Sequence, residues 1–146
     1  MIKVLFYHKV ALFTASFDFE YHKDGIKSVY PALASVYLKT HLELNHPEIA
    51  DKMEWLLPIQ IEKTNEELIE IINREQPDLF CTGHYIWNHD SIMEQLKAIK
   101  PHIPETTKMV VGGPHIDVSQ NPDFFEKYPF VILLPMRQEK MRFQIS

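Results

Sequence analysis

A short apolar run ends in two adjacent glycines at Lys108 to His115, where the sequence is KMVVGGPH. Residues 108–111 have the length and composition of a buried strand, and Gly112 and Gly113 follow at once. Glycines at a strand end let the backbone come close to a bulky group. In an open parallel sheet, ligands bind outside the carboxyl ends of the strands. The pair therefore predicts either a platform for a large flat ligand or a tight turn that needs a positive φ.

Composition and charge restrict the class of protein. The chain has 146 residues, of which 45% are hydrophobic, and this length predicts one domain with a sizeable core. The formal net charge is -5, and lysine and arginine are scattered along the chain rather than clustered. This distribution argues against a nucleic-acid surface.

Cys81 and the N-terminal stretch bear on the compartment. Cys81 is the single cysteine, and its place in an apolar run predicts a small buried side chain in a reducing environment. The apolar part of residues 1–7 is too short for a secretory signal. No stretch approaches the ~20 apolar residues that a membrane span needs. We expect a soluble, cytoplasmic protein.

Apolar runs of strand length alternate with amphipathic stretches of helix length, which is the pattern of a parallel sheet covered by helices. We predict an α/β fold with an open Rossmann-like or flavodoxin-like sheet of about five strands in the order 2-1-3-4-5. The predicted strands are 3–7, 53–57, 78–82, 108–111 and 130–134. Helices are predicted to begin at Pro31, at a capping box formed by 64–67, between Asn88 and Ser91, and at Pro122.

Three loops meet at one edge of this predicted sheet: 8–30, 83–88 and 112–118. The second of them, from Gly83 to Asn88, contains aromatic and polar groups that suit a planar heterocycle. The alternative is that Tyr85 and Trp87 close the core while Asn88 caps the next helix. His84 and His115 follow neighbouring strands, where they could bind a metal, act as acid and base, or line a wall.

The first of these loops contains a second histidine pattern. Glu20 precedes His22 by two residues, and a carboxylate can orient an imidazole whose other nitrogen meets a metal. A solvated loop with a turn at Asp24 and Gly25 is the alternative. The chain has no GxGxxG after its first strand and no GxxxxGK[ST] motif, so nucleotide phosphates lack their usual backbone cradle.

Three segments together resemble the N-terminal cobalamin-binding domain of radical S-adenosylmethionine enzymes. They are YIWN at 85–88 with the helix that follows, VVGGP at 110–114, and PAL at 31–33 leading into the first helix. The resemblance covers about residues 1–131. It implies a domain that holds base-off cobalamin, with the nucleotide tail between the sheet and the loops after strands one, three and four. We expect a cobalamin-binding-like domain at 1–134 and an atypical tail at 135–146, which looks truncated or altered.

The resemblance also implies site residues. Gly112 and Gly113 would give the nucleotide tail room, and residues 83–88 would form a flanking wall. Family members often have a serine near the position of Gly83, so a hydroxyl contact would come from Thr82 or be absent. The expected cofactor-binding residues are Thr82, Gly83, His84, Tyr85, Trp87, Asn88, Gly112, Gly113, Pro114 and His115.

His22 is the candidate metal ligand under the same resemblance. It lies in Glu20-x-His22-x-x-Gly25, which approaches the D-x-H-x-x-G motif whose histidine binds cobalt from below. This segment is farther from the first strand than that motif normally is. The complete enzymes also carry a CxxxCxxC motif for an iron-sulfur cluster on a following barrel. With Cys81 alone, this chain cannot bind a four-iron cluster in that way.

Three functions stay open at this point. The first is a cobalamin-binding module of a radical S-adenosylmethionine, methyltransferase-like enzyme, with the corrinoid as ligand and a catalytic domain supplied in trans. The second is a non-catalytic interaction domain that keeps the fold without the ligand. The third is a small enzyme that uses His84 and His115 as acid and base.

Overall fold

Five parallel strands form one sheet in a computed structural model that describes residues 1–8, 33–59, 62–84, 89–112 and 122–133. The strand order is β2-β1-β3-β4-β5, which confirms the predicted α/β class and topology. The strands are β1 (Ile2–Tyr7), β2 (Met53–Trp55), β3 (Leu79–Gly83), β4 (Lys108–Gly112) and β5 (Val131–Leu133). The helices are α2 (Leu33–Asn45), α3 (Pro47–Ala50), α4 (Asn65–Glu75), α5 (His89–Ile99) and α6 (Phe124–Lys127), with a 3-10 turn at Lys100–His102.

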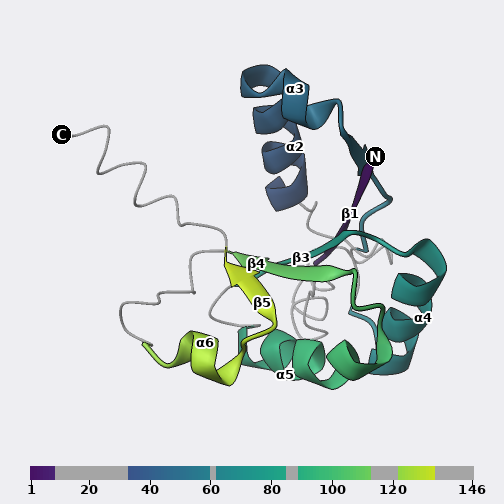
Figure 1. The fold of residues 1–146 in the computed structure, drawn as a ribbon, viewed down its shortest axis with the longest axis vertical. Helices are drawn as coiled ribbons and strands as arrows, with labels where there is room; N and C mark the ends of the chain where they lie inside the picture. The colour runs from purple at the N-terminus through teal and green to yellow at the C-terminus, as the bar shows by residue number, and fades with distance from the viewer. Residues whose placement is uncertain (9–32, 60–61, 85–88, 113–121, 134–146) are drawn as a thin grey trace, which may run out of the picture.

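Helices cover both faces of the sheet. Figure 1 shows α2 on one side and α4, α5 and α6 on the other. The larger core lies between the sheet and these last three helices, and it includes Leu5, Phe80, Met109, Leu68, Leu96 and Phe124. The smaller core on the α2 side contains Val4, Phe6, Cys81 and Val110, against which Leu38 and Trp55 pack. The two cores give the sheet two distinct faces.

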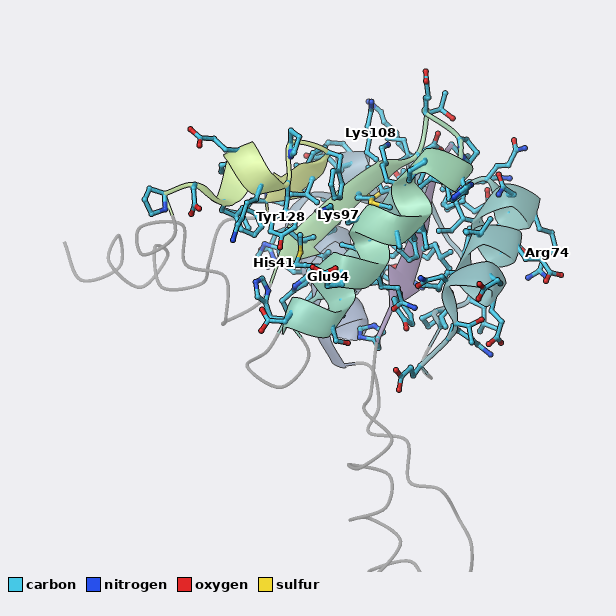
Figure 2. All side chains as sticks on the ribbon, turned by 90° about the horizontal axis from the view of Figure 1, so that it is seen from below. His41, Arg74, Glu94, Lys97, Lys108 and Tyr128 are labelled. Atoms are coloured by element: carbon cyan, nitrogen blue, oxygen red, sulfur yellow. The ribbon has the colours of Figure 1, made fainter. Side chains whose placement is uncertain are left out.

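The outer surfaces of α4 and α5 are charged, because the helical period of their sequences places apolar residues on one face and polar residues on the other. Figure 2 shows Glu94 and Lys97 on α5 and Arg74 on α4, and all three residues are exposed. Ile92 and Leu96 on the inner side of α5 are buried. In the part of the chain described, no helix has both the length and the apolar character to cross a membrane.

The start of α4 confirms the predicted capping box. The Thr64 hydroxyl accepts a hydrogen bond from the Glu67 backbone N–H at 3.1 Å, and the Thr64 N–H donates to Glu67 Oε1 at 3.2 Å. These reciprocal bonds satisfy amide groups that a helix start otherwise leaves without partners. They also hold the pKa of the Glu67 carboxyl below its ordinary value, because the ionised form is the better acceptor.

Element boundaries differ from the sequence prediction mainly around β2. The expected strand extended to Leu57, but β2 ends at Trp55, and Leu57 is 89% exposed. The chain returns to the sheet at Ile59, whose N–H donates to the Phe6 carbonyl at 2.8 Å. Pro58 has no N–H to donate to the ladder, and this is the physical cause of the interruption between Trp55 and Ile59. The short helix α3, which begins at Pro47, was not predicted at all.

Candidate functional site

One row of residues marks the carboxyl ends of three neighbouring strands. Tyr7 of β1 is paired with Thr82 of β3, and Gly83 of β3 is paired with Gly112 of β4. Because His8 follows Tyr7, the same register places it level with both glycines. We call His8, Gly83 and Gly112 the rim row. The chain order reverses between β1 and β3, and ligands of open α/β sheets bind at such a switch point.

The rim row belongs to the α2 face of the sheet. Two residues earlier on the same strands, Phe6, Cys81 and Val110 form a buried apolar row on that face. Side chains alternate along a strand, so the rim row occupies the next level on the same side. Gly83 and Gly112 have no Cβ, which leaves backbone without side chains over β3 and β4 at this level. Any larger residue would fill the space that a ligand needs for close approach.

Thr82 and His84 lie on the opposite face, under the start of α5. The Thr82 hydroxyl and His84 Nε2 are 2.7 Å apart, and His84 Nδ1 is 3.0 Å from His89 Nδ1. His84 is 0% exposed, and its backbone N–H donates to the Gly112 carbonyl at 2.7 Å. Since two imidazole nitrogens at this distance share one proton, one donates and the other accepts. Both ring nitrogens of His84 are engaged, so the geometry does not favour His84 as an acid or base.

His89 is a residue that the sequence reasoning missed. It begins α5, and its ring meets that of His84 edge-on at a centroid distance of 5.1 Å. It also stacks on Phe124 of α6 at 6.4 Å. These contacts join the end of β3 to two helices. Its place at the predicted helix start, five residues after His84, was the available signal.

His8 is the second residue that sequence reasoning overlooked, because it was treated only as the first residue of a long loop. Its ring is stacked on Phe6 with a centroid distance of 5.7 Å and an angle of 8°, and Phe6 is stacked in turn on Trp55 at 6.1 Å. His8 Nε2 is buried, and it has no hydrogen-bond partner in the described part of the chain. Burial lowers the pKa of His8 below its ordinary value of 6.5, which favours the neutral imidazole.

A buried hydrogen-bond network fixes the end of β1. The Tyr7 hydroxyl donates to Gln95 Oε1 and accepts from the Lys63 N–H, both at 3.1 Å. The Gln95 amide donates to the Lys63 carbonyl at 2.6 Å. Burial raises the pKa of Tyr7 to about 12. This network ties β1 to α5 and to the segment before α4, so the strand end that carries His8 is held from the other face of the sheet.

Several expected site residues lie outside the described residues. They are His22, Tyr85, Trp87, Asn88, Gly113, Pro114 and His115. Of the expected set, Thr82, Gly83, His84 and Gly112 are described, and all four lie at the ends of β3 and β4. The strand register brings them together but divides them between two faces, with the glycines on the α2 side.

Cys81 behaves as the sequence predicts for a buried side chain. It is 5% exposed, and burial raises the pKa of its thiol to about 12, which keeps it protonated and unreactive. Among the described residues, no group of three or more histidine, cysteine, aspartate or glutamate side chains is arranged to hold a metal ion.

A cavity of about 620 Å³ lies away from the rim row, between α4 and the segment that follows β2. Its lining residues are Leu5, Leu56, Leu57, Pro58, Ile59, Lys63, Ile71, Arg74 and Glu75. None of the expected cofactor residues lines it. Because Leu5 and Ile71 belong to the larger core, the cavity is on the face opposite the rim row.

Comparison with known proteins supplies a sequence relative. The chain is 29% identical over 117 residues to the cobalamin-dependent radical SAM methyltransferase TokK of Streptomyces tokunonensis. The match covers 79% of this chain but 16% of that methyltransferase, so the chain spans a small part of its length. No protein-family model matches.

Among solved structures, the chain is similar to the pilus assembly protein CpaE from Caulobacter crescentus CB15, at a TM-score of 0.41 and 12% identity. That likeness covers 91% of this chain and 88% of the other. The sequence comparison thus shows that most of the chain is distantly similar to a segment of a cobalamin-dependent radical SAM methyltransferase.

Proposed function

We propose that this chain is a cobalamin-binding module whose ligand lies at the carboxyl ends of β1, β3 and β4. The observation that carries the proposal is the pairing of Gly83 with Gly112 beside the switch point of the sheet. Two side-chain-free positions on adjacent strands allow a bulky ligand to approach the backbone. The distant similarity to a cobalamin-dependent methyltransferase supports the same ligand class.

The residues of the sheet edge would have different parts in holding the cofactor. Gly83 and Gly112 would leave room for the nucleotide tail, and Gly113, Pro114 and His115 would continue that surface. Tyr85, Trp87 and Asn88 would flank the nucleotide tail. Thr82 and His84 would support this flanking segment from the α5 face of the sheet. We propose base-off binding, with His22 as the candidate lower ligand of cobalt.

Catalysis would need a further domain. When bound, the corrinoid supplies the cobalt chemistry of methyl transfer, while the protein contributes binding and orientation. We propose that a radical S-adenosylmethionine domain acts on the bound cofactor, whether in a longer chain or in trans. The module itself would not be catalytic, and we propose a cytoplasmic location for it.

Mixing the purified protein with hydroxocobalamin tests the proposal directly. Colour that co-elutes with the protein on gel filtration, with a visible spectrum changed from that of the free cofactor, is the expected result. A colourless protein peak would refute cobalamin binding and would favour the non-catalytic interaction domain. Replacing His22 by alanine tests cobalt ligation separately, since an unchanged spectrum would remove His22 as the lower ligand.

Two glycine variants test the location of the site. Gly83→Val and Gly112→Val add a β-branched side chain that strands accommodate well, so the fold should persist. Each variant should weaken cobalamin binding by about tenfold or more, which corresponds to about 1.4 kcal/mol or more. Lys108→Val is the matched control, because it places the same side chain at the exposed opposite end of β4. Equal binding by all three variants would place the ligand elsewhere.

A further inference from the structure

The buried nitrogen of His8 needs a partner that the described protein does not supply. Its Nε2 is buried and makes no hydrogen bond within the described residues. Buried polar atoms in native proteins are nearly always hydrogen-bonded, and an unsatisfied one lowers stability. Such an exception needs a physical explanation, and a bound ligand is one.

The position of His8 is fixed rather than incidental. Its backbone N–H donates to the Ile59 carbonyl at 2.8 Å, which continues the pairing of β1 beyond its last residue. Its ring continues the nearly parallel stack of Trp55 and Phe6 on the α2 face of the sheet. Both the backbone and the ring are therefore held in place before any ligand binds.

The charge state of His8 limits the kind of partner. Burial lowers its pKa, so the imidazole is neutral at pH 7 and has one nitrogen that donates and one that accepts. A neutral ring does not compensate the charge of a buried phosphate or carboxylate. An uncharged polar group, such as an amide or a hydroxyl, is the suitable partner.

The rim row gives this partner a place. His8 is level with Gly83 and Gly112 on the same face of the sheet, and neither glycine has a side chain to occupy the space beside it. Neighbouring strands lie about 4.8 Å apart, so a molecule over the two glycines comes within reach of the His8 ring.

We propose that His8 Nε2 is a ligand contact, forming a hydrogen bond with a neutral amide or hydroxyl group of the molecule that lies over Gly83 and Gly112. This inference rests on the proposed function, under which that molecule is a corrinoid, whose periphery carries amides. His8 is then a binding residue at the β1 border of the site. Among the described residues this nitrogen is unsatisfied, and the ligand would satisfy it.

The test compares His8→Phe with the wild type in two measurements. Phenylalanine keeps the stack on Phe6 but removes the polar atom, so the ligand-free variant should melt at a higher temperature than the wild type. Its affinity for hydroxocobalamin, measured by spectral titration, should fall about three- to tenfold, as expected for one neutral hydrogen bond. His8→Gln, which returns a polar group near the position of Nε2, should recover part of the affinity.

His102→Phe is the matched control, because His102 is exposed in the 3-10 turn that follows α5 and should change neither measurement. If His8→Phe binds hydroxocobalamin as tightly as the wild type does, the His8 contact is refuted while the proposed function survives. If the wild type binds none, the proposed function fails and this contact fails with it. A spectrum that changes from imidazole-ligated to unligated cobalt in His8→Phe would also overturn the proposal, since His8 would then bind the metal.

Discussion

Removing one hydroxyl from the end of β1 should destabilise the whole domain. In Tyr7→Phe, the hydrogen bonds to Gln95 Oε1 and from the Lys63 N–H, both 3.1 Å long, are lost. A neutral hydrogen bond contributes about 1 kcal/mol, and a buried partner left unsatisfied costs about 1–3 kcal/mol. Gln95 is buried, whereas Lys63 is half-buried. We therefore expect a loss of about 2 kcal/mol in the free energy of unfolding, nearly all from the Gln95 side.

Urea unfolding followed by circular dichroism measures this loss. The midpoint should fall while the slope stays unchanged, because the same surface is exposed on unfolding. Tyr128→Phe is the matched control: Tyr128 packs against Phe124 and Phe130 through its ring, so the change should cost less than about 0.5 kcal/mol. Equal midpoints for the two variants would refute the role assigned to the Tyr7 hydroxyl.

Three further changes test other contacts. Thr64→Ala should cost about 1 kcal/mol by removing the cap of α4. It should also raise the pKa of the Glu67 carboxyl toward its ordinary value. The lowered pKa of Glu67 stabilises the fold above the ordinary carboxyl pKa, and this contribution is lost as the pH falls. Thr82→Val should cost about 1–3 kcal/mol by leaving buried His84 Nε2 without its 2.7 Å partner, and Thr82→Ser should cost less, both measured by urea unfolding. Because the pKa of Cys81 is raised from 9.0 to about 12, its contribution is complete below pH 9 and is lost as pH rises toward 12, so Cys81→Val should lessen the alkaline loss of stability in a melting series.

Most strands and helix starts of the fold could be predicted from hydrophobic periodicity and from local motifs. The apolar runs that became β1, β3 and β4 are buried on both faces, as the strands of a parallel sheet must be, and their composition shows this directly. The capping box at Thr64 is a local signal that needs no tertiary information. The detour at Leu57 was harder to predict, because it depends on the pairing of Ile59 with β1, a contact between distant parts of the sequence.

The candidate site could be predicted from the sequence only in part. Once the strand order is known, the sequence predicts a glycine at the end of each of two neighbouring strands. It does not predict the register that sets Gly83 beside Gly112. The proposed role of His8 depends on the burial of one atom, and the contact of His84 with His89 depends on how two ring nitrogens come to lie 3.0 Å apart. For His8 the residue spacing gives no signal, and for His89 the only signal is its place at the predicted helix start, five residues after His84.

Side chains alternate along β3, so the proposed contacts lie on two different faces of the sheet. Gly83 is on the α2 face, whereas Thr82 and His84 are on the α5 face and bonded to each other. A ligand over the rim row therefore meets the glycines and His8 before it meets the Thr82 hydroxyl, which is already engaged. Loss of cobalamin affinity in Gly83→Val, with unchanged affinity in Thr82→Val, would place the ligand on the α2 face. The opposite pattern would place it against α5 and would remove both the glycine platform and the His8 contact.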